Sequence, residues 1–433
     1  MRAERMAWRG VALGAILAAL AGCARIPTAP AGPADPLERH LAAQAALGDA
    51  PIVPGNRVTV LDGGAASFAA MFDAIAAARD HVHLEFYILQ DVRVPGRPGP
   101  SLFELLAEKL RQGVGVALLY DAFGSAAVPA EKLAALRALG ARTLAFNPVD
   151  PLRARAGWAP NDRDHRKILV VDGRIGFTGG VNLDKVYENP CHGPSTGFPV
   201  GDVGDACWRD TAIRIEGPAV AELQRLFLHN WQKQRGPALA CSCFPPLPQA
   251  GPTRLAILGS APEEGEPRFY RALMAAIGSA RQRVWLATGF FVPTHDEREA
   301  LAAAARRGVD VQLVLPSVNG VPTALAAQHA AYDDLLKAGV RIAEVEGEVL
   351  HAKLAMVDGV WTAIGSSNLD RRSVAWNDEV DALALGPEVA GQVAVVMQRD
   401  ARLAQPVTLA GWRARGLGER LRELWARIWV DLL

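Results

Sequence analysis

An internal repeat with a period of about 190 residues constrains the fold of this chain more than any other feature, and that period is too long for a solenoid. Three segments occur twice in the same order: 70–88 and 272–292, 106–121 and 301–316, and 136–146 and 335–345. Each copy begins with a helical pattern and continues into a strand pattern. Helix–strand alternation at this spacing predicts α/β sheets with parallel pairs and right-handed crossovers. We therefore expect two homologous α/β halves, 51–235 and 254–433, separated by a Pro- and Cys-rich linker at 236–253.

Each half carries one polar segment of the same design. The first runs from Asp164 to Asn182 (DHRKILVVDGRIGFTGGVN) and the second from Leu350 to Asn368 (LHAKLAMVDGVWTAIGSSN). Both contain His-x-Lys, an apolar run, Asp-Gly, a second apolar run, a Gly-rich turn and Asn. A single match of this kind is weak, but two matches at the same place in a repeat are not a coincidence.

The segment predicts a β-hairpin that gathers polar groups at its open end. Residues i and i+2 of a strand face the same side, so His165 and Lys167 project together, as do His351 and Lys353. Asp-Gly has hairpin-turn chemistry, and the returning strand delivers the Gly-rich turn and the Asn to the end that bears His and Lys. Lys, an Asn amide, a hydroxyl and exposed backbone N–H groups around an imidazole form a phosphate cradle with a nucleophile in it. The small and polar residues assigned to this cradle are Gly180, Asn182, Ser366, Ser367 and Asn368.

This pattern resembles the HxKxxxxD and GxxN signature of the phospholipase D superfamily, and the resemblance covers nearly all of residues 55–433. It implies two α/β/α sandwiches that pair as a pseudo-dimer, with one active site at their interface. It also implies that one His attacks phosphorus to form a phosphohistidine while the other protonates the leaving alcohol. We assign His165 as the nucleophile and His351 as the general acid, and the reverse order stays open. Lys167, Lys353, Asn182 and Asn368 would hold the non-bridging oxygens, and neither a metal nor a cofactor is expected.

Four carboxylates complete the catalytic set that the resemblance implies. Asp172 and Asp358 belong to the signature, but each lies on the turn seven residues after its His, so we expect both to brace the fold. An orienting carboxylate for each imidazole lies further along the chain: Glu379 follows His351 by 28 residues, and Asp210 is the candidate in the first half. A carboxylate on a ring nitrogen fixes the tautomer and stabilises the imidazolium. For Asp210 the alternative is a surface salt bridge.

Further stretches are similar to bacterial cardiolipin synthases: LEFYIL (84–89), YDAFGS (120–125), FTGGVNL (177–183), FVP (291–293) and GSSNLDRRS (365–373). This similarity implies transfer of a phosphatidyl group onto the glycerol of phosphatidylglycerol or onto another alcohol, with membrane phospholipids as partners. A departure is the GFFV sequence at 289–292, where the family often carries a Tyr before Phe.

Three other functions compete with this interpretation. Hydrolysis, with water as the acceptor, is the main alternative, as in a phospholipase D. A nuclease of the same superfamily is disfavoured, because Lys plus Arg equals Asp plus Glu at 46 each and a nucleic-acid binder usually carries a basic surplus. A non-enzymatic lipoprotein is disfavoured because both motif sets are complete.

The N-terminus predicts export and lipid anchoring. Three arginines precede a short apolar run, 11–20, and the lipobox-like Leu20-Ala21-Gly22-Cys23 follows at its end. The run is too short for an ordinary transmembrane helix, and the last four residues resemble a bacterial lipobox whose Cys23 is lipidated after removal of residues 1–22. Ala24 after the cysteine indicates the outer membrane, with the body of the protein on its periplasmic face. An uncleaved anchor or a plain secretory signal is the alternative, and residues 23–50 are expected to form a Pro-rich tether.

Four further cysteines, an insertion and the C-terminus are less informative. Cys191, Cys207, Cys241 and Cys243 allow three pairings, and we expect one or two structural disulfides because no CxxC pair or His cluster accompanies them in the sequence. Residues 188–206 occur only in the first half and are either a lid over the site or a surface loop, and His192 within them is expected to be an ordinary surface histidine. Residues 417–433 form an amphipathic pattern that favours core packing over seating at a lipid interface.

Overall fold

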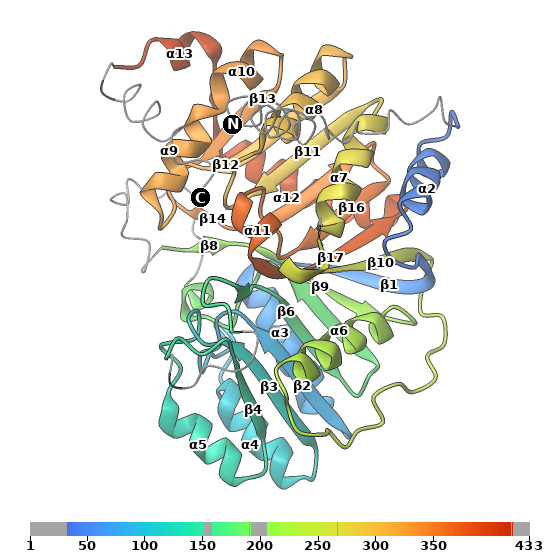
Figure 1. Ribbon diagram of the computed structural model, residues 1–433, viewed down its shortest axis with the longest axis vertical. Helices are drawn as coiled ribbons and strands as arrows, with labels where there is room; N and C mark the ends of the chain where they lie inside the picture. The colour runs from blue at the N-terminus through green and yellow to red at the C-terminus, as the bar shows by residue number, and fades with distance from the viewer. Residues whose placement is uncertain are drawn as a thin grey trace, which may run out of the picture.

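The computed structural model describes residues 33–150, 152, 158–189, 191, 206–265, 267–416 and 418 (Figure 1). Two α/β units lie one above the other and share a single continuous sheet. The predicted lipobox with Cys23, the end of the chain beyond 418 and most of the insertion, His192 included, lie outside the described residues. None of the described helices is long and apolar enough to cross a bilayer.

The first half contains β1 (Val53–Asp62), α3 (Gly63–Ala77), β2 (His81–Phe86), α4 (Leu102–Arg111), β3 (Gly115–Asp121), α5 (Ala130–Ala138), β4 (Arg142–Phe146), β5 (Arg163–Asp164), β6 (Lys167–Val171), β7 (Ile175–Gly179), the 3-10 helix η2 (Lys185–Glu188), β8 (Trp208–Arg209), β9 (Thr211–Glu216) and α6 (Val220–Lys233). Its main strands lie in the order β1-β9-β7-β6-β2-β3-β4, in which β2, β3 and β4 are parallel.

The second half contains β10 (Thr253–Ser260), η3 (Pro262–Glu264), α7 (Arg268–Ser279), β11 (Arg283–Thr288), α8 (His295–Arg306), β12 (Asp310–Pro316), α9 (Pro322–Ala330), α10 (Tyr332–Lys337), β13 (Arg341–Val345), β14 (Val349–Leu350), β15 (Lys353–Val357), β16 (Trp361–Gly365), α11 (Arg371–Ala375), β17 (Asn377–Leu385), α12 (Pro387–Leu403), β18 (Ala404–Val407) and α13 (Leu409–Arg413). Its order, β10-β17-β16-β15-β11-β12-β13, repeats that of the first half, and β1 pairs with β10 antiparallel at the centre. The expected pair of α/β halves is confirmed.

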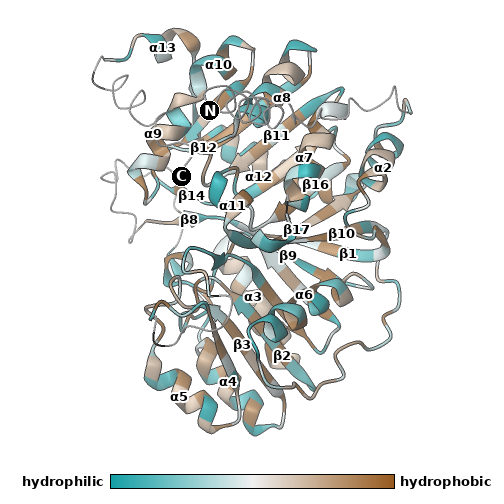
Figure 2. Cartoon of the chain, in the orientation of Figure 1, coloured by the Kyte–Doolittle hydropathy of each residue, from teal (hydrophilic) through white to brown (hydrophobic). Residues whose placement is uncertain are grey.

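Helices cover both faces of each half. Leu84 and Phe86 of β2 pack under α3 and α4, whereas Ala117 and Leu119 of β3 pack under Phe227 of α6. A further apolar cluster joins β9, β10 and β17 with α6 and α12, so the two halves share one core. Figure 2 shows the strands as largely hydrophobic between more polar helices, as expected for a sheet buried on both faces.

The hairpin turns follow from the Asp-Gly pairs. Asp172 (φ 53°) and Gly173 (φ 62°) are both left-handed, as are Asp358 (φ 52°) and Gly359 (φ 69°), which is the backbone that a two-residue hairpin of type I′ requires. Each aspartate also binds the start of a neighbouring strand. The Asp172 carboxylate accepts N–H groups from residues 79, 80 and 81.

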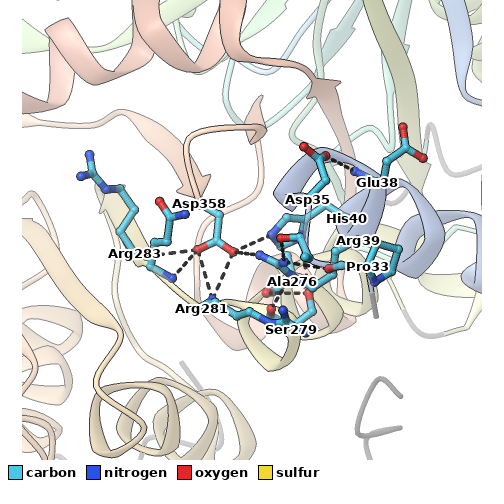
Figure 3. Close-up of polar contacts among 12 residues, drawn as sticks. Pro33, Asp35, Glu38, Arg39, His40, Ala276, Ser279, Arg281, Arg283 and Asp358 are labelled. Carbon is cyan, nitrogen blue, oxygen red and sulfur yellow. Dashed lines mark hydrogen bonds and ion pairs between the residues drawn. The ribbon is translucent and has the colours of Figure 1, made fainter. Parts of the chain in front are cut away.

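Helix α2 (Pro36–Leu47) corrects the prediction that residues 23–50 form only a tether. Asp35 caps the helix and Pro36 is its first residue, a sequence that starts a helix rather than a linker. The helix packs on the second half, where the Arg39 guanidinium lies 2.6 Å from an Asp358 carboxylate oxygen and His40 lies 3.2 Å from the same atom (Figure 3). The predicted tether is therefore shortened at its C-terminal end.

Candidate active site

Each catalytic His-x-Lys pair is held in place by the opposite half. Strand β5 pairs with β17, and the His165 N–H donates to the Asp378 carbonyl at 2.9 Å. Strand β14 pairs with β8, and the His351 N–H donates to the Arg209 carbonyl at 2.7 Å. These short crossed strands bring both imidazoles to the junction of the halves.

The orienting carboxylates are exchanged between the halves. His165 Nδ1 lies 3.0 Å from Glu379 Oε2, and His351 Nδ1 lies 2.7 Å from Asp210 Oδ2. Sequence order had placed Glu379 after His351 and Asp210 in the half of His165, so the pairing differs from the order along the chain. All four groups are buried, which excludes the surface salt bridge considered for Asp210.

Neighbouring polar groups fix both carboxylates. The Ser366 hydroxyl donates to Glu379 Oε2 at 2.5 Å, and the Tyr187 hydroxyl donates to Asp210 Oδ2 at 2.8 Å. The same Tyr187 oxygen lies 3.1 Å from His351 Nδ1. Tyr187 was not predicted as a site residue, although it follows the GGVN turn by only five positions.

The site is a buried cluster in which cations and imidazoles influence one another. Burial lowers the pKa of His165 to about 4 and that of His351 to about 3, although the paired carboxylates oppose the shift. Burial also lowers the pKa of Lys167 to about 7 and that of Lys353 to about 8. Lys353 acts on His165 and Lys167 acts on His351, so the two motifs face one common site. At neutral pH both imidazoles are uncharged, Lys353 is mostly charged and Lys167 is partly charged, so the positive charge for an anion comes from the lysines.

Each lysine is folded back onto its own motif. Lys167 Nζ donates to the His165 carbonyl at 2.6 Å, and Lys353 Nζ donates to the His351 carbonyl. The Asn182 side-chain oxygen accepts the Ile88 N–H at 3.3 Å. The buried Asn368 side-chain oxygen has no hydrogen-bond partner among the described residues. Both lysines therefore lie beside their own imidazoles, and the roles of Lys167, Lys353, Asn182 and Asn368 in holding phosphate oxygens stay predictions.

The Gly-rich turns have a different role from the predicted phosphate cradle. A Cβ at Gly180 would collide with the Asp210 carboxylate, and the Gly180 N–H donates to the Thr211 carbonyl. Ser366 and Ser367 direct their hydroxyls to Glu379 and Asp381, respectively. The prediction that these groups are open to substrate is corrected, because the sheet and the carboxylates use them.

Asp172 and Asp358 lie at the far end of their hairpins and are not part of the reacting cluster. Lys167 pairs with Phe86 at one end of β6, whereas Val171, next to Asp172, pairs with Val82 at the other. Four strand steps separate them, which is about 13 Å. Both carboxylates bind backbone N–H groups, which agrees with the expectation that these two members of the signature brace the fold and do not take part in the chemistry.

Aromatic side chains surround the imidazoles. The Tyr87 ring meets the His165 ring edge-on with centroids 5.1 Å apart, and Trp208 lies 5.0 Å from His351. Phe290, from the GFFV departure, lies 6.4 Å from His351. Tyr87 stands inside LEFYIL, which the sequence analysis singled out, and Trp208 stands two residues before Asp210, but alternation along a strand does not reveal which aromatic side chain faces the site.

The structure pairs Cys191 with Cys207 and Cys241 with Cys243. It also brings His81 and His83 beside Cys243, a His cluster that sequence spacing alone did not reveal.

Comparison with known proteins agrees with this geometry. The family model described as "Cardiolipin synthase, PLD-like domain" matches residues 273–401. The chain is 34% identical over 400 residues to a cardiolipin synthase of Geobacillus thermodenitrificans, covering 91% of this chain and 75% of the relative. It is 35% identical over 352 residues to cardiolipin synthase A of Pseudomonas aeruginosa, covering 81% and 68%.

A solved structure shows the same fold at low sequence identity. The phosphatidylserine synthase of Haemophilus influenzae superimposes with a TM-score of 0.62 at 14% identity, over 91% of this chain and 98% of that one. With the repeated His-x-Lys hairpins and the similarity of sequence across most of its length, the chain belongs to the cardiolipin synthase family of phospholipase D-like proteins.

Proposed function

We propose that this protein is a phosphatidyltransferase that acts on membrane phospholipids, with phosphatidylglycerol as donor and acceptor. The observation that carries the proposal is the exchanged pair of His–carboxylate contacts, His165 with Glu379 and His351 with Asp210. Each carboxylate occupies Nδ1 and leaves Nε2 of its imidazole for the substrate. Two such rings at one buried junction fit a nucleophile and a general acid on opposite sides of one phosphoryl group.

The first half-reaction forms a covalent intermediate. His165 Nε2 attacks phosphorus, and the bond between phosphorus and the oxygen of the head-group glycerol breaks. His351 Nε2 gives a proton to that oxygen, so free glycerol leaves. His351 is uncharged in the free protein because burial lowers its pKa, so the bound phosphodiester anion and Asp210 must favour its protonated form. Lys167 and Lys353 neutralise the charge that builds on the non-bridging oxygens.

The second half-reaction reverses the roles. His351 takes the proton from the hydroxyl of a second phosphatidylglycerol, the oxygen attacks phosphorus, and the bond to His165 breaks. One phosphodiester replaces another, so the exchange is nearly isoenergetic and needs no activated donor. The assignment of His165 as the nucleophile rests on the family resemblance.

Purified protein in phosphatidylglycerol vesicles without divalent metal tests the proposal. We expect cardiolipin and free glycerol, and an acid-labile phosphatidyl adduct on one histidine under single-turnover conditions. His165→Ala and His351→Ala should each abolish the reaction. His329→Ala is the control, because His329 contacts Glu344 and Trp412 rather than the site.

Other products would point elsewhere. Phosphatidic acid without cardiolipin would replace transfer by hydrolysis, and nicked plasmid without lipid turnover would indicate a nuclease. An adduct on neither histidine would refute the covalent mechanism.

We also propose that lipidated Cys23 anchors the protein to the outer membrane, with the body on the periplasmic face. The lipobox-like Leu20-Ala21-Gly22-Cys23 and the following Ala24 support this. Labelled fatty acid should enter the wild-type protein and not Cys23→Ser, and the label should fractionate with outer membranes. A soluble, unlabelled mature protein would contradict the anchor.

A further inference from the structure

The linker between the halves folds against the first half at the end of the sheet opposite the catalytic histidines. The Ser242 N–H donates to Asp80 Oδ2 at 2.8 Å, and the Cys243 carbonyl lies close to Gly173, where a Cβ would reach it. Strand β2 begins here at His81 and ends at Phe86, which pairs with Lys167 of the active site. Five strand steps, about 16 Å, therefore separate this end from the reacting groups.

Nitrogen and sulfur ligands converge at this point. His81 and His83 are two residues apart in β2, so their side chains lie on the same face of the sheet, toward α6 and the linker. Their ring centroids are 4.3 Å apart. A ring nitrogen of each and the sulfur of Cys243 lie within 4.8 Å of one another, and all three residues are buried. Cys241 is bonded to Cys243, so a second sulfur lies next to this group, although outside the 4.8 Å cluster itself. Two imidazoles and two thiols form the Cys2His2 set that Zn²⁺ prefers.

Outer groups hold the imidazoles as they do at metal centres. His81 Nδ1 lies 2.6 Å from an Asp80 carboxylate oxygen, the contact that fixes the tautomer of a metal-binding histidine and leaves Nε2 for the metal. The Gln224 amide lies between the rings: its oxygen is 3.1 Å from His81 Nε2, and its nitrogen is 3.0 Å from His83 Nδ1. Exchange of the amide oxygen and nitrogen by a half-turn of the Gln224 side-chain amide puts the oxygen on His83 Nδ1–H and the NH2 group on His81 Nε2, and this arrangement leaves the His83 Nε2 lone pair for an ion.

We propose that reduction of the Cys241–Cys243 disulfide creates a zinc site formed by Cys241, Cys243, His83 and His81. A dithiol supplies the two electrons: the bond between the two sulfurs breaks, the dithiol becomes a disulfide, and both cysteines gain protons. Binding of Zn²⁺ then releases the two thiol protons, and His81 exchanges its Gln224 contact for the metal. In the oxidised form the linker is held to the first half by contacts such as Ser242 N–H with Asp80. In the metal-bound form the ion would link the linker cysteines to the histidines of β2 directly.

The other cysteine pair is a weaker candidate and supplies a matched control. Cys191 and Cys207 lie near Glu348, also within 4.8 Å, but no histidine takes part and Cys191 is exposed. The Glu348 carboxylate is already paired with the Arg209 guanidinium. A metal held here would not depend on Cys243.

Metal binding to the full-length protein, with and without phosphine reduction, tests the proposal. Anaerobic reduced protein should bind one Co²⁺ per chain, with the intense visible bands of a tetrahedral ion and a thiolate-to-cobalt charge-transfer band. One equivalent of Zn²⁺ should displace the Co²⁺. The oxidised protein should bind neither ion at this site.

Variants locate the ion. Cys243→Ser and His83→Asn should abolish the charge-transfer spectrum or change it, whereas the double change Cys191→Ser with Cys207→Ser should leave it intact. Asp80→Asn should weaken Zn²⁺ binding about 10-fold to 100-fold while keeping the spectrum, because it acts through His81.

The comparison of reduced with oxidised wild-type protein needs no variant, so it stands even if a substitution prevents folding. Reduced protein that binds no Co²⁺ or Zn²⁺, or binds them without a thiolate band, would overturn the proposal. So would metal binding that survives Cys243→Ser but is lost when Cys191 and Cys207 are replaced.

Discussion

The exchanged carboxylates predict that Glu379→Gln slows the reaction through His165, although Glu379 belongs to the half that carries His351. Both carboxylate oxygens of Glu379 lie within hydrogen-bonding distance of His165 Nδ1, at 3.1 Å for Oε1 and 3.0 Å for Oε2. The substitution keeps the shape and a hydrogen-bonding oxygen but removes the negative charge. We expect the imidazole of His165 to lose its fixed tautomer and its electrostatic support when charge develops on the ring.

The size of the effect follows from the contact distance. A carboxylate about 4 Å from the charge centre of an imidazolium stabilises it by about 4 kcal/mol at an effective dielectric constant of 20. Lys167 and Lys353 act on His165 in the opposite direction, and the glutamine still accepts a hydrogen bond, so part of this energy is retained or cancelled. A net loss of about 3 kcal/mol corresponds to a fall in kcat of about 10²-fold.

The assay is single-turnover transfer from labelled phosphatidylglycerol, read as formation of the histidine adduct, with imidazole nitrogen chemical shifts as a second readout. Asp381→Asn is the matched control: Asp381 lies two residues along the same strand, is equally buried and is bonded to Ser367 as Glu379 is to Ser366. It contacts neither imidazole, so the His165 nitrogen shifts should match wild type, and any change in kcat should come only through the charge that Asp381 places near Lys353. Shifts that change at His351 and not at His165 in Glu379→Gln would refute the exchange.

Three further predictions concern pH, stability and metal. Because burial lowers the pKa of Lys167 to about 7 and that of Lys353 to about 8, both amines lose charge as pH rises, and kcat/KM should fall between pH 6 and pH 9; a flat profile would contradict this electrostatic role. Arg39→Met should lower the free energy of unfolding by about 3 kcal/mol in denaturant titrations, because it leaves the buried Asp358 carboxylate with one fewer cation, whereas the exposed Arg93→Met should cost under about 1 kcal/mol. The pKa of Asp358 is lowered in the folded protein, so the Arg39→Met difference should be full at neutral pH and shrink as pH falls below about 4, and a constant difference would argue against the ion pair. A chelator should leave the transfer rate of the oxidised protein unchanged, because the proposed chemistry uses side chains alone, and loss of activity in EDTA that zinc restores would count against it.

The duplication carried most of the fold prediction. A hydrophobic pattern that switches from helical to strand period, twice and in the same order, specifies two α/β units, and both have the predicted strand and helix segments. The local geometry of the His-x-Lys hairpin was also predictable, since alternation and Asp-Gly turn chemistry act over a few residues. Helix α2 was missed because the Pro-rich composition before it outweighed the Asp35-Pro36 start signal.

Partners at long range were not predictable from order along the chain. The sequence assigned no carboxylate across the halves, yet Glu379 serves His165 and Asp210 serves His351, because strands β5 and β8 cross to the opposite unit. Tyr187 joined the site for the same reason. The hydroxyls of Ser366 and Ser367 seemed available to phosphate until the tertiary structure placed carboxylates against them.

By itself, the sequence determined two repeated halves, a hairpin in each and the chemical character of one His-x-Lys pair per half, because these depend on side-chain type and short-range periodicity. Only the tertiary structure decided which groups touch: the exchange of carboxylates, the contact of Tyr187 with Asp210, and the meeting of His81 and His83 with Cys243. Those contacts join residues up to 214 positions apart, and the packing of two α/β units that share one continuous sheet sets their distances. No local propensity encodes such a contact, since its energy exists only after both halves have folded and docked.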